Sequence, residues 1–220
     1  MARLRVGVLI SGRGSNLQAL IEAAADPGYP AEIALVISNR PEAAGLHRAA
    51  QTGIAHQTIA ERDRRGFAAA ADTALRQPGA ELVALAGFMR LLDAGFVERW
   101  RDRMINIHPS LLPAFPGLHP QRQALAAGVR FSGCTVHFVR LEVDTGPIIA
   151  QAAVPVHDDD DEARLSARIL AAEHRLYPLA LRLYAEGRLK VDGNRVMVAG
   201  GTAPDLAAFN PSDAIASGRG

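Results

Sequence analysis

Short apolar runs alternate with helical patterns through the first half of the chain. The runs have few polar positions between their apolar ones, a pattern typical of strands that are covered on both faces in a parallel sheet. Strand candidates occupy residues 5–11, 32–38, 55–59, 81–87 and 104–107, and the helix candidates between them are Leu17–Ala25, Ala43–Gln51, Phe67–Arg76 and Asp93–Trp100. This order predicts a doubly wound α/β fold in which a mostly parallel sheet has helices on both faces.

The pattern changes in the second half, where two strands are predicted to pair antiparallel. "CTVHFVRLE" and "IIAQAAVPV" are joined by the turn "VDTGP", and strands joined by a short turn pair in this way. We expect them to extend the parallel sheet. A helix is predicted over Glu162–Tyr177, where Pro178 ends it and a short continuation reaches Glu186. Residues 188–198 predict a hairpin that turns at Asp192–Asn194.

Composition changes again after Ala199. Residues 200–220 are rich in Gly, Ala, Pro, Ser and Asp without periodicity, which predicts a disordered tail. Residues 1–199 are predicted to form a single domain. A chain of 220 residues with 49% hydrophobic residues contains enough apolar material for one sizeable core.

Charge, cysteine content and the amino terminus limit the classes of function. The formal net charge is +1, so no basic field favours nucleic acid or an anionic membrane, and neither is expected as a partner. The single cysteine, Cys134, excludes an internal disulfide and a cysteine-built metal site. The apolar run Val6–Ile10 is too short for a signal peptide or a membrane span. We therefore expect a cytoplasmic protein.

Three unusual stretches are predicted to lie at the carboxyl edge of the sheet, where open α/β sheets bind ligands. "SGRGSNLQAL" follows the first strand, "AGFMRLL" the fourth and "NIHPSLLP" the fifth. Their shared location follows from the polarity of the strands.

The stretch "SGRGSNL" leads from a strand into a helix through glycines. Such a turn exposes backbone N–H groups and the positive end of the helix dipole, which suits a phosphate. It lacks the Lys of a Walker A loop, and Leu17 stands where a dinucleotide fingerprint has its third glycine. A single phosphate monoester therefore fits better than a dinucleotide. The alternative is a tight turn in which Ser15 or Asn16 caps the helix.

In "NIHPSLLP", residues two apart on a strand face the same side, so Asn106 and His108 project together. Pro109 restricts His108 to extended geometry. An amide can donate to a developing oxyanion and an imidazole can move protons near neutral pH, which is the equipment for acyl transfer to an amine. Asp144 could pair with His108 if its loop folds back. A structural Asn–His pair and an ordinary Asp turn are the alternatives.

Glu173 stands among apolar residues of the predicted helix, its neighbours being Ile169, Leu170, Leu176 and Tyr177. A carboxylate on such a stripe is costly unless something hydrogen-bonds it. A sugar hydroxyl and a backbone N–H are the two partners considered. The seven histidines show no metal-ligand spacing, so no metal is expected.

Taken together, these stretches resemble the folate-dependent phosphoribosylglycinamide formyltransferases of purine synthesis. The similarity extends over roughly residues 3–192. It is carried by "VLISGRGSNLQAL", "LAGFMRLL", "NIHPSLLPAFPGLH", "TVHFV", "DTGPIIAQAAVPV" and "EHRLYP". The chain departs from the family at Pro120–Gln121, where Thr-His is usual.

The resemblance implies a formyltransferase-like, Rossmann-related fold, with a phosphate- or nucleotide-binding half (1–104) and a folate-binding and catalytic half (105–199). It also implies a cis bond at Leu112–Pro113 and roles for particular residues. The phosphate-binding loop would consist of Gly14, Ser15 and Asn16, the ribose hydroxyls would meet Glu173, and the catalytic group would be Asn106, His108 and Asp144. The folate site would comprise Met89, Arg90, Leu91, Leu92, Val97, Met104, Asn106 and Val139, with Arg64 at the glutamate tail.

The implied activity is transfer of the formyl group of 10-formyltetrahydrofolate, as co-substrate, to the amine of glycinamide ribonucleotide. Three alternatives stay open at this point. They are a formyltetrahydrofolate hydrolase, another folate-dependent formyltransferase such as one that acts on initiator tRNA, and a non-catalytic nucleotide or folate sensor. A homodimer is one assembly that the sequence allows.

Overall fold

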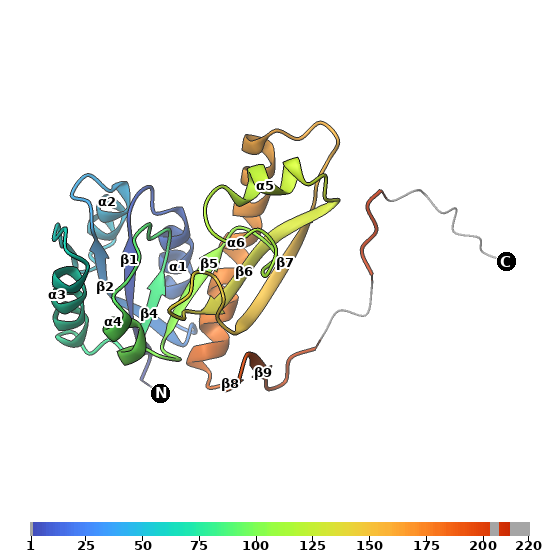
Figure 1. Cartoon of the computed structure of the whole chain (residues 1–220). Helices are drawn as coiled ribbons and strands as arrows, with labels where there is room; N and C mark the ends of the chain where they lie inside the picture. Colours follow the sequence, from blue (N-terminus) through green and yellow to red (C-terminus); the bar gives the residue numbers. More distant parts are fainter. Residues whose placement is uncertain (1, 203–206, 212–220) are drawn as a thin grey trace.

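The computed structural model describes residues 2–202 and 207–211, and its centre is a seven-stranded sheet (Figure 1). The strand order is β3-β2-β1-β4-β5-β6-β7. The first five strands pair parallel, whereas β6 and β7 are added antiparallel. The strands are β1 (Leu4–Ile10), β2 (Ala31–Ser38), β3 (His56–Thr58), β4 (Leu82–Leu85), β5 (Met104–His108), β6 (Phe131–Phe138) and β7 (Ile148–Pro155). The predicted fold is confirmed, with antiparallel strands in the second half.

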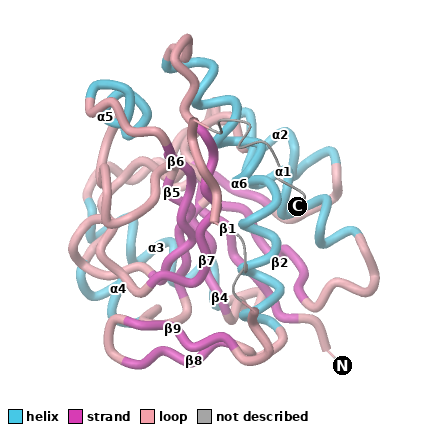
Figure 2. Tube along the Cα trace, turned by 90° about the vertical axis from the view of Figure 1, so that its right-hand side faces the viewer, coloured by secondary structure: helices cyan, strands magenta, loops and turns pink. Residues whose placement is uncertain are grey.

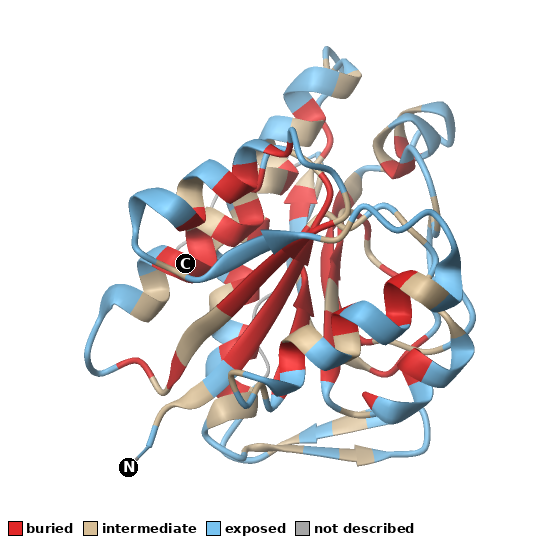
Figure 3. Ribbon diagram, turned by 90° about the vertical axis from the view of Figure 1, so that its left-hand side faces the viewer, coloured by how far each residue is buried: buried red, intermediate tan, exposed pale blue. Residues whose placement is uncertain are grey.

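Helices cover both faces of this sheet (Figures 1 and 3). Val8 and Ile10 of β1 lie in a core with α1, α2 and α6, whereas Leu9 between them packs with α3 and α4 on the opposite face. The alternation along one strand therefore supplies both cores. The helices are α1 (Ser15–Ala25), α2 (Ala44–Gln51), α3 (Arg64–Arg76), α4 (Ala94–Arg99), α5 (Pro120–Ala126) and α6 (Glu162–Ala185).

The predicted end of the last helix at Pro178 is wrong, because α6 runs through this residue to Ala185. Proline removes one helical hydrogen bond and costs about 3 kcal/mol in a helix interior. Beyond it, however, Ala180 and Leu181 are fully buried against the sheet, and their burial favours continuation. The Tyr29 hydroxyl also donates to the Pro178 carbonyl at 2.7 Å.

Two further boundaries differ from the prediction. Helix α5 lies in a segment for which the sequence predicted no helix, although Pro120 at its first position is a favourable start. Strand β6 begins at Phe131 and ends at Phe138, earlier than the predicted residues 134–142. The chain leaves the strand because residues 140–147 turn back towards β5 (see below).

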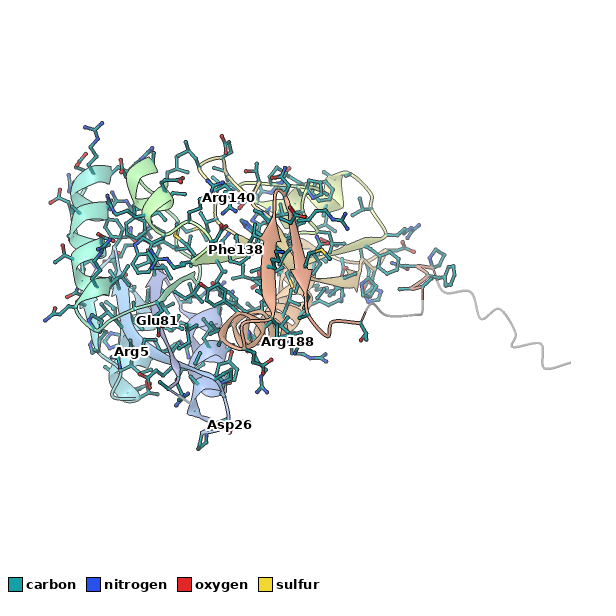
Figure 4. The ribbon with its side chains drawn as sticks, turned by 90° about the horizontal axis from the view of Figure 1, so that it is seen from below. Arg5, Asp26, Glu81, Phe138, Arg140 and Arg188 are labelled. Carbon is teal, nitrogen blue, oxygen red and sulfur yellow. The ribbon has the colours of Figure 1, made fainter. Side chains whose placement is uncertain are left out.

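The predicted hairpin is present as β8 (Leu189–Asp192) and β9 (Arg195–Val198), which lie beside the sheet (Figure 2). Seen from below, Arg188 lies at the base of this hairpin, and Arg5 and Glu81 lie together at the amino ends of the strands (Figure 4). The Arg5 N–H donates to Glu81 Oε1 at 3.1 Å. The Arg5 group that donates is the backbone N–H, and this edge of the sheet holds no predicted site residue.

The predicted tail lies partly outside the described residues, which exclude residues 203–206 and 212–220. Among the described ones, the Asn210 side chain donates to the Val156 carbonyl at 2.9 Å. No described helix is long and apolar enough to cross a membrane.

Tyr177 joins α6 to the centre of the sheet and provides a test of this packing. Its hydroxyl is buried and donates to the Leu85 carbonyl at 3.0 Å, with the Ile105 carbonyl at 3.3 Å. Tyr177→Phe should lower the free energy of unfolding by about 1–3 kcal/mol, because buried carbonyls lose their partner. Urea denaturation measures this change. Tyr184→Phe, on the same helix, keeps its edge contact with Phe138 and should change stability by less than about 0.5 kcal/mol; equal effects would contradict the assignment.

Candidate active site

Asn106 and His108 lie on one face at the carboxyl end of β5. Their neighbours Ile105 and Ile107 face the core formed with α1 and α6, as the alternation predicts. His108 is only 6% exposed, and both of its ring nitrogens face acceptors. Nε2 is 3.0 Å from the Phe115 carbonyl oxygen and Nδ1 is 3.3 Å from Asp144 Oδ2. Only a ring that is protonated on both nitrogens satisfies both acceptors.

Asp144 reaches His108 because the loop between β6 and β7 folds back over the end of β5. Its backbone is in the left-handed region, with φ 56°, which is uncommon for a residue other than glycine. The Gly117 N–H donates to Asp144 Oδ2 at 2.8 Å. Burial alone would raise the pKa of this carboxyl group, but the His137 ring, the Gly117 N–H and the charge at His108 outweigh it and lower the pKa. Asp144 is therefore held as a carboxylate.

His137 completes this group, although the sequence analysis gave it no role. Its Nε2 is 3.2 Å from Asn106 Nδ2 and 3.7 Å from Asp144 Oδ1. Its Nδ1 is 3.0 Å from the Phe138 carbonyl and donates to it, and Nε2 lies between the Asn106 amide and the Asp144 carboxylate. The available signal was the strand register, since His137 pairs directly with Asn106 across β5 and β6.

The loop after β5 is held by a buried hydroxyl on β6. Thr135 Oγ1 accepts from the Leu112 N–H at 3.0 Å and donates to the Ser110 carbonyl at 2.7 Å. Gln151 Nε2 donates to the Leu112 carbonyl at 2.9 Å, and the implied cis bond at Leu112–Pro113 is present. These contacts fix the segment that brings the carbonyl of Phe115 to His108.

The glycine turn stands at the end of β1, and α1 begins directly after it. The N-cap residue is Gly14, with φ 70° and no side-chain cap, so the alternative that Ser15 or Asn16 caps the helix is wrong. A Cβ on Gly14 would stand 2.6 Å from the Cα of Gly45. Glycine is therefore required by backbone conformation and by the close approach of α2.

Asn16 and Glu173 meet beside this turn. Asn16 Nδ2 donates to Glu173 Oε2 at 2.9 Å, a partner that was neither of the two considered from the sequence. Glu173 is 5% exposed. Burial raises its pKa to about 7, although the hydrogen bond from Asn16 acts to lower it. Asn16 Oδ1 is buried without a partner among the described residues, so this corner can accept further hydrogen bonds from a ligand.

The residues implied for the folate site divide into two groups. Val97 and Met104 are buried in the core with α3 and α4, where Leu92 and Val139 pack against them. By contrast, Met89 and Leu91 are 68% and 57% exposed on the 87–92 loop.

Arg64 and Arg90 lie beside this apolar group. Arg64 is exposed at the start of α3. Arg90 donates to the carbonyl oxygens of Glu61 and Arg62 at 2.7 and 2.8 Å and stacks over Phe67. Arg90 therefore ties the 87–92 loop to the segment that leads into Arg64.

Backbone and side-chain contacts connect these parts. The Ser11 hydroxyl donates to Asn39 Oδ1 at 2.6 Å and accepts from the Met89 N–H at 2.8 Å, so it joins the end of β1 to the 87–92 loop. A cavity of about 240 Å³ opens at Asp144 between the 112–116 and 143–148 segments. None of the residues implied for the folate site lines this cavity. Within the described residues, no group of three or more metal-ligating side chains occurs.

Comparison with known proteins places this geometry in a family. The family model "Formyl transferase" matches residues 4–181. The chain belongs to the formyl transferase family. Among its relatives, the phosphoribosylglycinamide formyltransferase of Escherichia coli is 43% identical over 204 residues, which cover 91% of this chain and 96% of that protein.

Two further comparisons support this membership of the family. The trifunctional purine biosynthetic protein adenosine-3 of Drosophila melanogaster is 54% identical over 190 residues, or 84% of this chain, and the chain spans only 14% of that protein's length. The crystal structure of glycinamide ribonucleotide transformylase 1 from Symbiobacterium toebii superimposes with a TM-score of 0.87 at 50% identity, covering 90% of this chain and 94% of that one. The resemblance inferred from the sequence is confirmed at the level of the family.

The buried carboxyl of Glu173 predicts an unusual dependence of stability on pH. Its pKa is about 7 in the folded protein against 4.5 as an ordinary value, so the folded chain holds a proton that the unfolded chain releases. The contribution of Glu173 to the free energy of unfolding is therefore fully present below pH 4.5. It is lost as the pH rises from 4.5 through 7, by on the order of 3 kcal/mol.

Glu173→Gln should abolish this loss, because the neutral amide still accepts from Asn16. We expect the variant to be more stable than the wild type at pH 8 and nearly equal at pH 5, measured by urea denaturation at both. Glu22→Gln on α1, at an exposed position, should change stability by less than about 0.5 kcal/mol at either pH. A Glu173→Gln protein that is less stable than the wild type at pH 8 would overturn the assignment.

Proposed function

We propose that this protein transfers the formyl group of 10-formyltetrahydrofolate to the amine of glycinamide ribonucleotide, a step of purine synthesis. The observation that carries the proposal is the convergence of Asn106, His108 and Asp144 at the end of β5, two strands away from a glycine turn beside Asn16 Oδ1, to which no described residue donates. The side chains at the end of β5 suit acyl transfer, and the glycine turn at the end of β1 suits a phosphorylated sugar. Two of the relatives described above are named phosphoribosylglycinamide formyltransferase and glycinamide ribonucleotide transformylase 1, which supports this acceptor.

The catalytic step is attack of the substrate amine on the formyl carbon. The carbonyl oxygen becomes an oxyanion in the tetrahedral intermediate, and donors aimed at it lower the barrier. Neither His108 nitrogen is free in this structure. The oxyanion therefore replaces the uncharged Phe115 carbonyl at Nε2, since an N–H bonds a charged acceptor more strongly. Asp144 keeps the ring protonated from the other side.

Asn106 supplies the second donor to the oxyanion, and His137 orients its amide. When the intermediate collapses, the formyl carbon keeps its bond to the substrate nitrogen and releases the folate nitrogen. The proton lost by the attacking amine passes to that leaving nitrogen, by way of water beside Asp144. Charges and atoms balance without a metal or a redox partner.

The glycine turn and Glu173 would hold the phosphoribosyl end. Gly14, Ser15 and Asn16 offer N–H groups at the start of α1, where the helix dipole favours an anion. Two ribose hydroxyls can donate, one to Asn16 Oδ1 and the other to the Glu173 carboxylate, which relieves the cost of burying both acceptors. These contacts would come from both halves proposed from the sequence, the glycine turn from residues 1–104 and Glu173 from residues 105–199.

The folate would lie on the opposite side of Asn106, against the apolar residues of the 89–92 loop and α4. Met89 and Leu91 would become covered, with Leu92, Val97, Met104 and Val139 as the base of the pocket. Arg64 stands at the outer end of this surface and suits a glutamate carboxylate.

Dependence of formyl release on the acceptor tests the proposed function. With formylfolate alone we expect negligible deformylation, and addition of glycinamide ribonucleotide should start it, followed by absorbance of the released folate. Release without the acceptor would instead identify a formyltetrahydrofolate hydrolase. Binding of both ligands with no release in any mixture would identify a sensor.

Removal of the imidazole tests the catalytic group. His108→Ala should lower kcat on the order of 10²–10⁴-fold, because the variant loses the proton donor to the oxyanion. Asp144→Asn should also lower kcat, because the amide no longer supplies a negative charge beside the His108 ring. Near-normal turnover by a folded His108→Ala enzyme would falsify the proposed role.

A further inference from the structure

Helix α2 packs against the back of the glycine turn through two hydrogen bonds to consecutive carbonyl groups. The Gly45 N–H donates to the Gly12 carbonyl at 3.1 Å. Arg48 Nε donates to the Arg13 carbonyl at 3.0 Å. Both carbonyl oxygens therefore point towards α2.

Peptide planarity turns these bonds into a constraint on the front of the turn. In a trans peptide the carbonyl and the following N–H point in opposite directions. With the Gly12 and Arg13 carbonyls fixed towards α2, the N–H groups of Arg13 and Gly14 point away from it. Consecutive N–H groups aimed in one direction form a concave site for an anion. They stand beside the N–H groups at the start of α1, which have no acceptor within the helix.

The Arg48 guanidinium also joins this turn to α1. Its Nη1 donates to Gln18 Oε1 at 3.2 Å, and Gln18 Nε2 donates to Glu22 Oε1 at 2.9 Å. Arg48 is half-buried, with its Cδ 3.5 Å from the place where a Cβ on Gly14 would stand. One planar group thus fixes the turn and the first turn of α1 relative to each other.

We infer that Arg48 is a positioning residue for the phosphate of the nucleotide substrate. The inference rests on the proposed function and extends it, because Arg48 acts through the Arg13–Gly14 peptide. Without the guanidinium, this peptide is free to rotate and its N–H leaves the site. The loss falls on binding of the phosphorylated substrate, whereas the formyl transfer step and the folate site are untouched.

Two variants separate geometry from charge. Arg48→Met removes the hydrogen bonds and should raise KM for glycinamide ribonucleotide by about tenfold, the effect of one charge-assisted hydrogen bond. We expect kcat and KM for formylfolate to change by less than about twofold. Arg48→Lys keeps the charge but cannot reach both acceptors with one planar fork, and should resemble Arg48→Met. Arg101→Met, an exposed arginine paired with Glu98, controls for net charge and should match the wild type.

A second measurement does not depend on turnover. Inorganic phosphate is titrated into the unliganded wild-type protein and Arg48→Met, with calorimetry as the readout. Weaker phosphate binding by about tenfold in the variant is expected. This arm distinguishes the two ideas, since a wild-type protein that binds phosphate but transfers no formyl group would refute the proposed activity alone.

Three results would overturn the inference. One is an unchanged affinity for phosphate in Arg48→Met. Another is a parallel rise of KM for both substrates, which indicates general structural damage. The third is an Arg48→Lys enzyme equal to the wild type, which shows that charge alone suffices.

Discussion

The buried pair of His108 and Asp144 is the interaction on which the rest of the site depends. Both side chains are less than a tenth exposed, so their desolvation is costly and must be offset by further hydrogen bonds. The Phe115 carbonyl and the Gly117 N–H supply these bonds. Consequently the segment after β5 and the loop before β7 must both be in place before the pair is stable. The antiparallel strands β6 and β7 return the chain so that Asp144 reaches β5.

The second buried carboxylate follows the opposite principle. Glu173 has an amide as its partner instead of a cation, and its pKa is raised to about 7. Such a group lowers the stability of the folded protein near neutral pH. It is typical of a binding site, where a ligand supplies the hydrogen-bond donors that the protein lacks. The pKa of Asp144 is lowered because histidine rings and an N–H group face its carboxylate. The pKa of Glu173 is raised because burial outweighs its one hydrogen bond. The two carboxyl groups are therefore suited to different work, one to holding a proton on a histidine and the other to accepting from a sugar.

Local pattern predicted most of the fold, since strand and helix types follow from hydrophobic periodicity. It also brought out Asn106 and His108, which share one face of a strand that ends at Pro109, Asp144, which precedes Thr-Gly-Pro in a turn, and the glycine turn itself. The end of the helix predicted at Pro178 was wrong, since burial of the residues after it keeps α6 continuous. His137 and Arg48 were missed for a related reason. Their roles depend on the register of β6 and on the packing of α2, which are contacts between distant parts of the chain.

The order of strands sets the distance between the two ends of the site. β1, which leads into the glycine turn, and β5, which carries His108, are separated only by β4. Adjacent strands lie about 4.8 Å apart, so the two strand ends are about 10 Å apart. Under the proposed function, a phosphorylated sugar with a short amide arm would span that gap, and its amine would arrive at the face of β5 that carries Asn106 and His108. The same face continues into the apolar core of α3 and α4, so the formyl donor would approach from that side. The strand order would then place the two substrates on opposite sides of the end of β5.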